Sequence, residues 1–224
     1  GLLSYRLSRV VNDETTVLAD NYTETEYTDT WEADRQAFVY YTVAAVTSAG
    51  ESEAVTSESF AVGAPYPIPY KESFAGGKTE TQPWSVEQVA GYMGTWEIEQ
   101  QGDQPYIKAQ DGDDGLATFD GYHSWTKDCE LRLISPAIDI SKYIDPELSF
   151  YFYHYNGLPG WWQEEPDPVN ETMCVEISMD GGPFQVIPGS DITLYAADSS
   201  WKQYKFDLAN YRKCTSVRIA FRGK

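Results

Sequence analysis

The sequence predicts an all-β fold, and three observations support that prediction. Apolar and polar residues alternate in short runs, such as FVYYTVAAV at 38–46 and ELSFYFYHY at 147–155, with Asn, Asp, Gly and Ser between the runs. No stretch of ten or more residues combines a helix cap with the 3.6-residue apolar spacing of an amphipathic helix. Aromatic residues make up 15% of the chain, including 17 Tyr and 7 Trp, so the chain can bury a core.

The charge of the chain narrows the classes of partner. Its 224 residues suit one large β domain or two ordinary ones. The 35 acidic and 16 basic residues give a formal net charge of −19, which would repel phosphate backbones and anionic membrane surfaces. No run of about 18 apolar residues is present. We therefore expect neither a nucleic-acid partner nor membrane insertion.

Composition and spacing predict two domains joined by a short linker. Residues 1–62 carry alternating runs that are each followed by turn residues. The stretch GAPYPIPY at 63–70 holds Pro65, Pro67 and Pro69, which restrict φ, remove backbone donors and favour a stiff, extended connector. The second domain is then expected over 71–224, where it opens on the stretch ESFAGGKTETQPW.

The second domain is predicted to be a sandwich of short strands. Its alternating runs lie at 94–100, 105–110, 116–121, 129–140, 147–155, 172–180, 183–187, 202–208 and 216–223. Leu148, Phe150 and Phe152 share one face of their run, which is expected to pack against a core. Val175 and Ile177 likewise share a face opposite polar neighbours.

Three stretches of the first domain follow one another in an informative order: YRLSRVVND, TETEYTDT and YTVAAVTSAGESEA. Together they resemble the second half of a fibronectin type III domain. Tyr41, Val43 and Ala45 match the inward-facing strand of that family, and residues 50–52 match its usual hairpin. The resemblance implies an incomplete fibronectin type III-like sandwich, whose core is expected to be partly exposed.

The second domain also carries an ordered set of stretches: ESF, DGDDG, LRLISPAIDIS, PELSFYFYH, VEISMDGGPFQVI, WKQYKFDLANY and VRIAFRG. This set resembles the choice-of-anchor J and cleaved-adhesin jelly rolls of bacterial surface proteins, which are distant relatives of the MAM domain. The resemblance implies a jelly-roll β-sandwich at 71–224, in an adhesin that is secreted or anchored at a bacterial cell surface.

The turn DGDDG at 111–115 is a candidate metal loop, because hard cations such as calcium take oxygens from flexible acidic loops. It is not an EF-hand, since Tyr122 stands where that loop needs a bidentate Glu. A solvated turn is the alternative, because Asp and Gly tolerate positive φ. The jelly-roll resemblance implies a structural calcium ion held by Glu72 and Asp111, with Asp113 and Asp114 as alternates.

The chain offers little for catalysis. His123 and His154 are its only histidines, neither lies in an HExxH motif, and no GxSxG elbow occurs. Surface charge explains the acidic pair Glu97 and Glu99, and the cluster of Glu164, Glu165 and Asp167, more simply than the paired carboxylates of a glycosidase do. The three cysteines lie far apart without metal spacing, which favours buried free thiols over one disulfide plus one thiol. We expect no enzyme, with a glycoside-active domain as the alternative.

The loop GLPGWWQEEPDP at 157–168 is the candidate ligand-binding segment. Trp161 and Trp162 are adjacent in a Gly/Pro loop, so both cannot point into a strand-built core. One indole, with Tyr153 or Tyr155 nearby, could stack on a sugar or insert into a partner. The alternative is that both tryptophans cover the open end of the sandwich.

These observations predict a non-catalytic, extracellular adhesion module. Its expected ligand is a glycan or a host or cell-surface protein, bound through loops of the jelly roll. Acidic neighbours of the tryptophan pair disfavour sulfated or uronic-acid ligands, so a neutral glycan or a basic protein surface is expected. A hydrolytic domain and a pure structural spacer are the alternatives.

Overall fold

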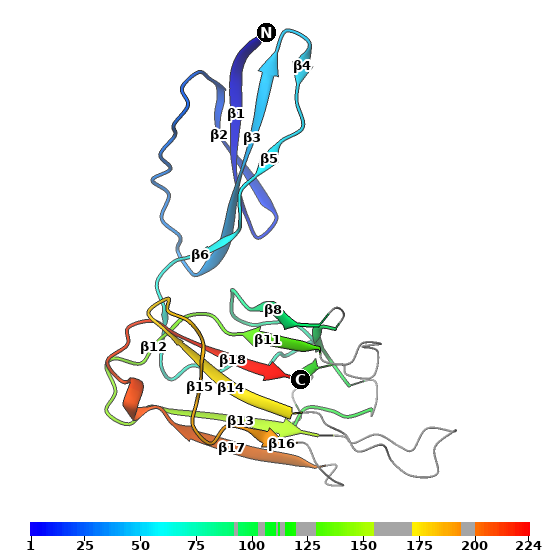
Figure 1. Ribbon diagram of the computed structural model, residues 1–224, viewed down its shortest axis with the longest axis vertical. Helices are drawn as coiled ribbons and strands as arrows, with labels where there is room; N and C mark the ends of the chain where they lie inside the picture. Colours follow the sequence, from blue (N-terminus) through cyan, green and yellow to red (C-terminus); the bar gives the residue numbers. More distant parts are fainter. Residues whose placement is uncertain are drawn as a thin grey trace. The chain divides into compact units, whose positions relative to one another are not determined.

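A computed structural model describes residues 1–91, 94–102, 106–110, 112, 115–119, 129–154, 172–193 and 200–224. The fold is all-β, as predicted, and consists of several antiparallel sheets. Within the described residues, the one helical element is the short 3-10 turn η1 at Ala209–Tyr211. The chain divides into two compact units, Gly1–Ala64 and Pro65–Lys224 (Figure 1).

Residues 1–64, all of which the structure describes, form one antiparallel sheet. Its strands are β1 (Leu2–Val11), β2 (Glu14–Tyr22), β3 (Ala37–Thr47), β4 (Gly50–Glu51), β5 (Val55–Thr56) and β6 (Phe60–Val62). The order is β2-β1-β3-β4, and β5 and β6 also pair with β3. The turn between β1 and β2 uses Asn12 and Asp13, both at positive φ, as tight hairpins require.

One face of this sheet leaves apolar side chains in solvent. Val39, on the central strand, is fully buried, but Val43 on the same face is 38% exposed. Their partners across the ladder, Phe60 and Val55, are 48% and 75% exposed. The expected partial exposure of this core is therefore confirmed, and Val43 is less buried than its predicted inward position implies.

The connection between β2 and β3 is pinned to the sheet by Asp29. Its Oδ2 atom accepts hydrogen bonds from Arg9 Nη1 at 2.7 Å and from the Tyr41 hydroxyl at 3.0 Å. Its Oδ1 atom accepts the Trp31 backbone N–H at 3.1 Å, and the Arg9 guanidinium lies 4.3 Å from the Trp31 ring centre. These contacts hold Asp29 and Trp31 next to Tyr41 on the sheet.

The first unit should lose stability in acid as Asp29 is protonated. Burial of the carboxyl opposes its ionisation, but the bonds from Arg9, Trp31 and Tyr41 outweigh burial and hold the pKa of Asp29 below its usual value of 3.8. Its contribution is therefore complete above that value and declines as pH falls through the lower, folded-state pKa. Acid titration of Trp31 fluorescence in a variant whose other tryptophans are phenylalanine measures this, and Asp29→Asn should flatten the profile below pH 4. An unchanged profile would contradict the assignment.

The second unit is a two-layer sandwich. Its larger layer contains β7 (Tyr66–Pro67), β8 (Ser85–Ala90), β11 (Glu130–Ile134), β12 (Ile138–Asp139), β14 (Thr172–Met179), β15 (Gln185–Val186), β16 (Ile192–Thr193) and β18 (Val217–Gly223). The main path is β15-β14-β18-β11-β8. The other layer consists of two separate pairs: β9 (Trp96–Glu99) with β10 (Leu116–Phe119), and β13 (Glu147–Tyr153) with β17 (Trp201–Asp207).

The division between the units falls within the predicted linker, but most of that linker belongs to the second unit. Tyr66 and Pro67 form β7, which pairs in parallel with β12. The Tyr66 hydroxyl also donates to the Gln82 carbonyl oxygen at 2.9 Å. The prolines therefore allow an extended edge strand here, because Pro67 needs no ladder donor of its own.

One predicted strand was wrong, and some observed strands, such as β8 and β16, were not predicted. Residues 106–110 were expected in a strand, but they are irregular and held by single bonds, such as Gly102 N–H to the Ile107 carbonyl oxygen at 3.0 Å. Strand β8 was not predicted, because it lies at the sheet edge with most side chains exposed and so lacks a clear alternation.

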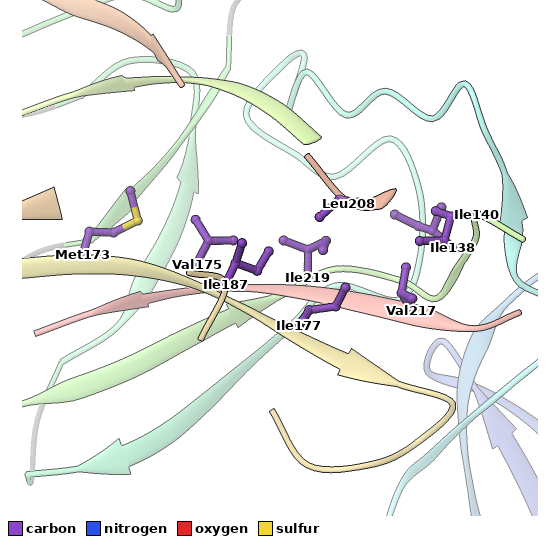
Figure 2. Close-up of a cluster of buried hydrophobic side chains, with 9 residues drawn as sticks. All are labelled: Ile138, Ile140, Met173, Val175, Ile177, Ile187, Leu208, Val217 and Ile219. Carbon is purple, nitrogen blue, oxygen red and sulfur yellow. The ribbon is translucent and has the colours of Figure 1, made fainter. Parts of the chain in front are cut away.

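The main core lies between the two layers (Figure 2). Nine buried residues form it: Ile138, Ile140, Met173, Val175, Ile177, Ile187, Leu208, Val217 and Ile219. Leu148, Phe150 and Phe152 of β13 pack against it, as their shared face predicted. A second cluster joins β9 and β10 to the same face of the large sheet through Trp96, Cys129, Leu131 and Leu133.

The opposite face of the large sheet holds a buried ion network centred on Glu176. This residue is 2% exposed, although its place in the alternation put it opposite the core. Its carboxylate accepts from Arg132 Nε at 2.5 Å and from Arg222 Nη1 at 2.9 Å. Glu87 and Glu130 extend the network to Arg132 and Arg222. These five charged side chains thus pair with one another across β8, β11, β18 and β14.

Candidate ligand-binding cleft

A cavity of about 600 Å³ lies inside the second unit, between the two pairs of the smaller layer. This volume is in the range of ligand pockets. Its floor is the inner face of the large sheet, where Leu133, Ile219 and Phe221 line it. Phe221 packs against both core clusters, so it marks the point where the smaller layer is divided.

Two strands form opposite walls of this cleft along their length. Every residue of 115–119, which includes β10, lines it, and so does every residue of 148–154, which includes most of β13. Consecutive residues of a strand point to alternate faces. A cavity that touches all of them therefore runs along the edge of each strand rather than over one face.

Aromatic side chains gather at the end of β13. The Tyr153 and Trp201 rings meet edge to face at 5.5 Å between centres, and Trp201 Nε1 donates to the Lys108 carbonyl oxygen at 3.1 Å. His154 follows directly, and its burial lowers the pKa of the imidazole, which favours the neutral ring. All three side chains line the cleft. Tyr153 is the predicted ligand residue that the structure describes.

The cleft lies beside the segments that the sequence singled out. Gly102, Gln110, Gly115, His154 and Thr172 line it, and each is next in sequence to a segment outside the described residues. The remaining predicted site residues belong to those segments: Tyr155, Trp161, Trp162, Asp111, Asp113 and Asp114.

Glu72 closes the loop that opens the second unit. Its Oε1 atom accepts the backbone N–H groups of Phe74 at 3.1 Å and Glu80 at 2.9 Å. Its Oε2 atom accepts the Thr81 N–H and hydroxyl and the Trp84 Nε1–H, at 3.0, 2.8 and 3.1 Å. One carboxylate thus gathers five donors, which explains a Thr- and Gln-rich turn between Phe74 and Trp84.

This closed loop forms part of the cleft and contacts the acidic turn. The Phe74 and Trp84 rings meet at 5.2 Å, and both line the cleft. Gly115, the last residue of DGDDG, packs so tightly against the Phe74 backbone that a Cβ atom there would lie 1.6 Å from the Phe74 carbonyl oxygen. The two segments of the calcium prediction therefore meet at Gly115.

The described residues do not assemble the predicted calcium site. No three His, Cys, Asp or Glu residues gather around a common point in the part of the chain that the structure describes. A carboxylate has about four lone-pair positions, and the five donors on Glu72 occupy them. As placed, Glu72 serves the loop, and a calcium ion held by Glu72 and Asp111, with Asp113 and Asp114 as alternates, stays a prediction.

Glu72→Gln separates the two roles of this carboxylate. We expect a loss of stability of about 2 kcal/mol, because the amide presents its own donors to N–H groups that need an acceptor. The loss should be the same with calcium and with chelator if the role is loop closure. If Glu72 is instead a metal ligand, calcium should raise the melting temperature of the parent chain but not that of the variant.

Several residues of the cleft were not predicted from the sequence. Trp84, Trp96 and Trp201 line it, and none of them was among the predicted ligand-binding residues. Trp96 Nε1 donates to the Leu131 carbonyl oxygen at 3.1 Å, which fixes its indole against β11. Predicting these residues requires knowing which strand edges face each other, and periodicity along one strand does not show that.

The three cysteines are free thiols, as favoured from their spacing. Burial raises the pKa of the Cys129 and Cys174 thiols, so both favour the unreactive protonated form.

No helix in the described ranges is long and apolar enough to span a bilayer. Comparison with known proteins finds no matching family model and no similar curated protein.

Proposed function

We propose that the second unit is a non-catalytic binding module of an extracellular or surface-anchored protein, which binds a glycan or a protein at the aromatic end of its cleft. One observation carries the proposal: a cleft of ligand size is lined by Tyr153, His154 and Trp201, and the segment that holds Trp161 and Trp162 follows His154 in sequence. The ordered set of stretches that resembles choice-of-anchor J and cleaved-adhesin jelly rolls supports the adhesin assignment.

The chemistry of the cleft favours recognition over turnover. Its lining is rich in aromatic and aliphatic side chains, which supply binding area and stacking faces. Two of its polar side chains are engaged in the structure of the loop: Glu72 accepts five hydrogen bonds, and burial raises the pKa of Tyr70 to about 12, so that hydroxyl stays protonated. The net charge of −19 directs the choice of ligand towards neutral or basic molecules.

Arrays of neutral glycans and of proteins test this proposal. Binding should weaken by about 2 kcal/mol or more in Tyr153→Ala, Trp161→Ala or Trp162→Ala, with little change in melting temperature. Tyr27→Ala, in the other unit, is the matched control and should bind like the parent chain. Binding lost only in proportion to folding would contradict the proposal, turnover of a polysaccharide would favour a hydrolase, and the absence of any ligand would favour a spacer.

A further inference from the structure

We propose that the cleft is a slot for one extended polypeptide strand, supplied by a partner protein, which pairs with β10 on one side and β13 on the other. This inference rests on the proposed binding function and names the class of partner. The inserted strand would join the two separate pairs into one continuous sheet in the order β9, β10, partner strand, β13, β17. Its main-chain bonds would supply affinity, as in other cases of strand addition.

The edge of β13 that faces the slot has a definite set of backbone groups. Among the described strands, β13 pairs with β17 alone, in an unbroken register. Leu208 N–H donates to the Pro146 carbonyl oxygen at 2.8 Å, which sets the phase of the antiparallel ladder. Because bonded positions alternate, Leu148, Phe150 and Phe152 bond towards β17. Ser149, Tyr151 and Tyr153 therefore direct their N–H and C=O groups towards the cleft.

The edge of β10 faces the same cleft from the other side. In the sheets that the structure describes, β10 pairs with β9 alone, over Leu116 to Phe119. All four of these residues line the cleft. Both pairs also pack on the same face of the large sheet, where Phe221 contacts each cluster. Two edges that no described strand pairs with thus line one cavity, and unpaired edges are templates for another strand.

The walls define the partner's side chains. Inward positions would rest on Leu133, Ile219 and Phe221, so they must be apolar. Outward positions would lie beside the β9–β10 pair, whose outer face carries Glu97 and Glu99 across from Thr118 and Leu116. With the net charge of −19, this favours Lys, Arg or Thr at outward positions. The expected partner segment therefore alternates apolar with basic or neutral polar residues.

Selection from a displayed library of random peptides of about ten residues, the upper end of usual strand lengths, tests the inference on the whole chain. Recovered peptides should share the alternating pattern and should lose binding when a central residue is replaced by proline. Amide hydrogen exchange should show new protection at Ser149, Tyr151 and Tyr153 when a peptide binds. Recovery of no alternating peptide, or protection confined to other parts of the chain, would overturn the inference.

A matched pair of proline variants locates the binding edge. Tyr151 and Gln203 are direct partners across the β13–β17 ladder, and neither N–H is bonded within it. Tyr151→Pro removes a donor that faces the cleft, whereas Gln203→Pro removes one from the outer edge of β17. Peptide binding should weaken about tenfold or more in Tyr151→Pro and stay unchanged in Gln203→Pro. Equal effects of the two variants would overturn the inference.

The same variants keep this inference separate from the proposed function. A glycan or protein ligand that loses affinity in Tyr153→Ala or Trp161→Ala but binds Tyr151→Pro normally would uphold a binding module and overturn the strand slot. An apolar small molecule that fills the cleft, and leaves the backbone amides of β13 unprotected, would overturn it as well.

Discussion

Gly115→Ala should be the most damaging single substitution in the described part of the second unit. An ideal Cβ atom at Gly115 would lie 1.6 Å from the Phe74 carbonyl oxygen and 2.2 Å from its carbonyl carbon. Both are backbone atoms of a loop that Glu72 holds closed, so neither can rotate away. We expect a loss of more than about 3 kcal/mol, because the loop and the β10 edge must separate. Urea unfolding measures it by tryptophan fluorescence, since all tryptophans but Trp31 lie in this unit.

Gly112→Ala, in the same DGDDG stretch, is the control for the Gly115 variant. Gly112 has φ of +80° and no neighbouring atom within 4 Å of an added Cβ. The free energy of unfolding of the variant should fall by only about 1–2 kcal/mol, which is the cost of a left-handed backbone conformation at a residue with a Cβ atom. Equal losses at the two glycines would contradict the steric role assigned to Gly115, which unlike Gly112 is not at positive φ.

Glu176→Gln is expected to cost about 3 kcal/mol. The substitution keeps the shape of the side chain but removes the charge that faces both Arg132 and Arg222. These guanidinium groups would remain on a largely buried face, at 16% and 30% side-chain exposure. Removal of one member of a buried ion network is costly because its partners stay desolvated. Glu87 and Glu130 still face the arginines, so the expected loss lies at the lower end of such effects.

Glu147→Gln provides the comparison for Glu176. Glu147 pairs with Lys205 at 2.9 Å on the outer strands, but both side chains are about half exposed. Solvent screens this pair, so its loss should cost less than about 1 kcal/mol. Denaturant unfolding of both variants at low and at high salt checks the difference. Similar losses in the two variants would contradict a buried role for Glu176.

The sequence predicted the strands best where one face is apolar and the other is not. Phe150 in β13 and Val175 in β14 lie in such runs, and both pack in the predicted core. The prediction failed for β8, whose exposed edge position imposes no apolar alternation. It also missed the burial of Glu176, since arginines from two other strands cover it. Periodicity within a strand shows which residues share a face, but not which strands become neighbours.

The candidate site depended even more on contacts between distant segments. The jelly-roll resemblance implied Glu72 as a calcium ligand, whereas the hydrogen-bond donors that surround its carboxylate come from residues up to 12 positions away and could not be read from the sequence. Tyr153 was predicted to lie near a ligand, and the structure places it on the cleft with Trp201. Trp201 lies far away in sequence, so no local pattern joined the two residues.

The span of the Glu72 hydrogen bonds also bears on the order in which the second unit folds. These bonds join residues 2 to 12 positions apart, whereas the bond from Arg222 to Glu176 joins residues 46 apart. Closing a short loop costs less chain entropy than bringing distant strands together. The opening loop can therefore form early, as a local nucleus, and present Phe74 and Trp84 as a ready-made surface on which β9, β10 and β11 later assemble.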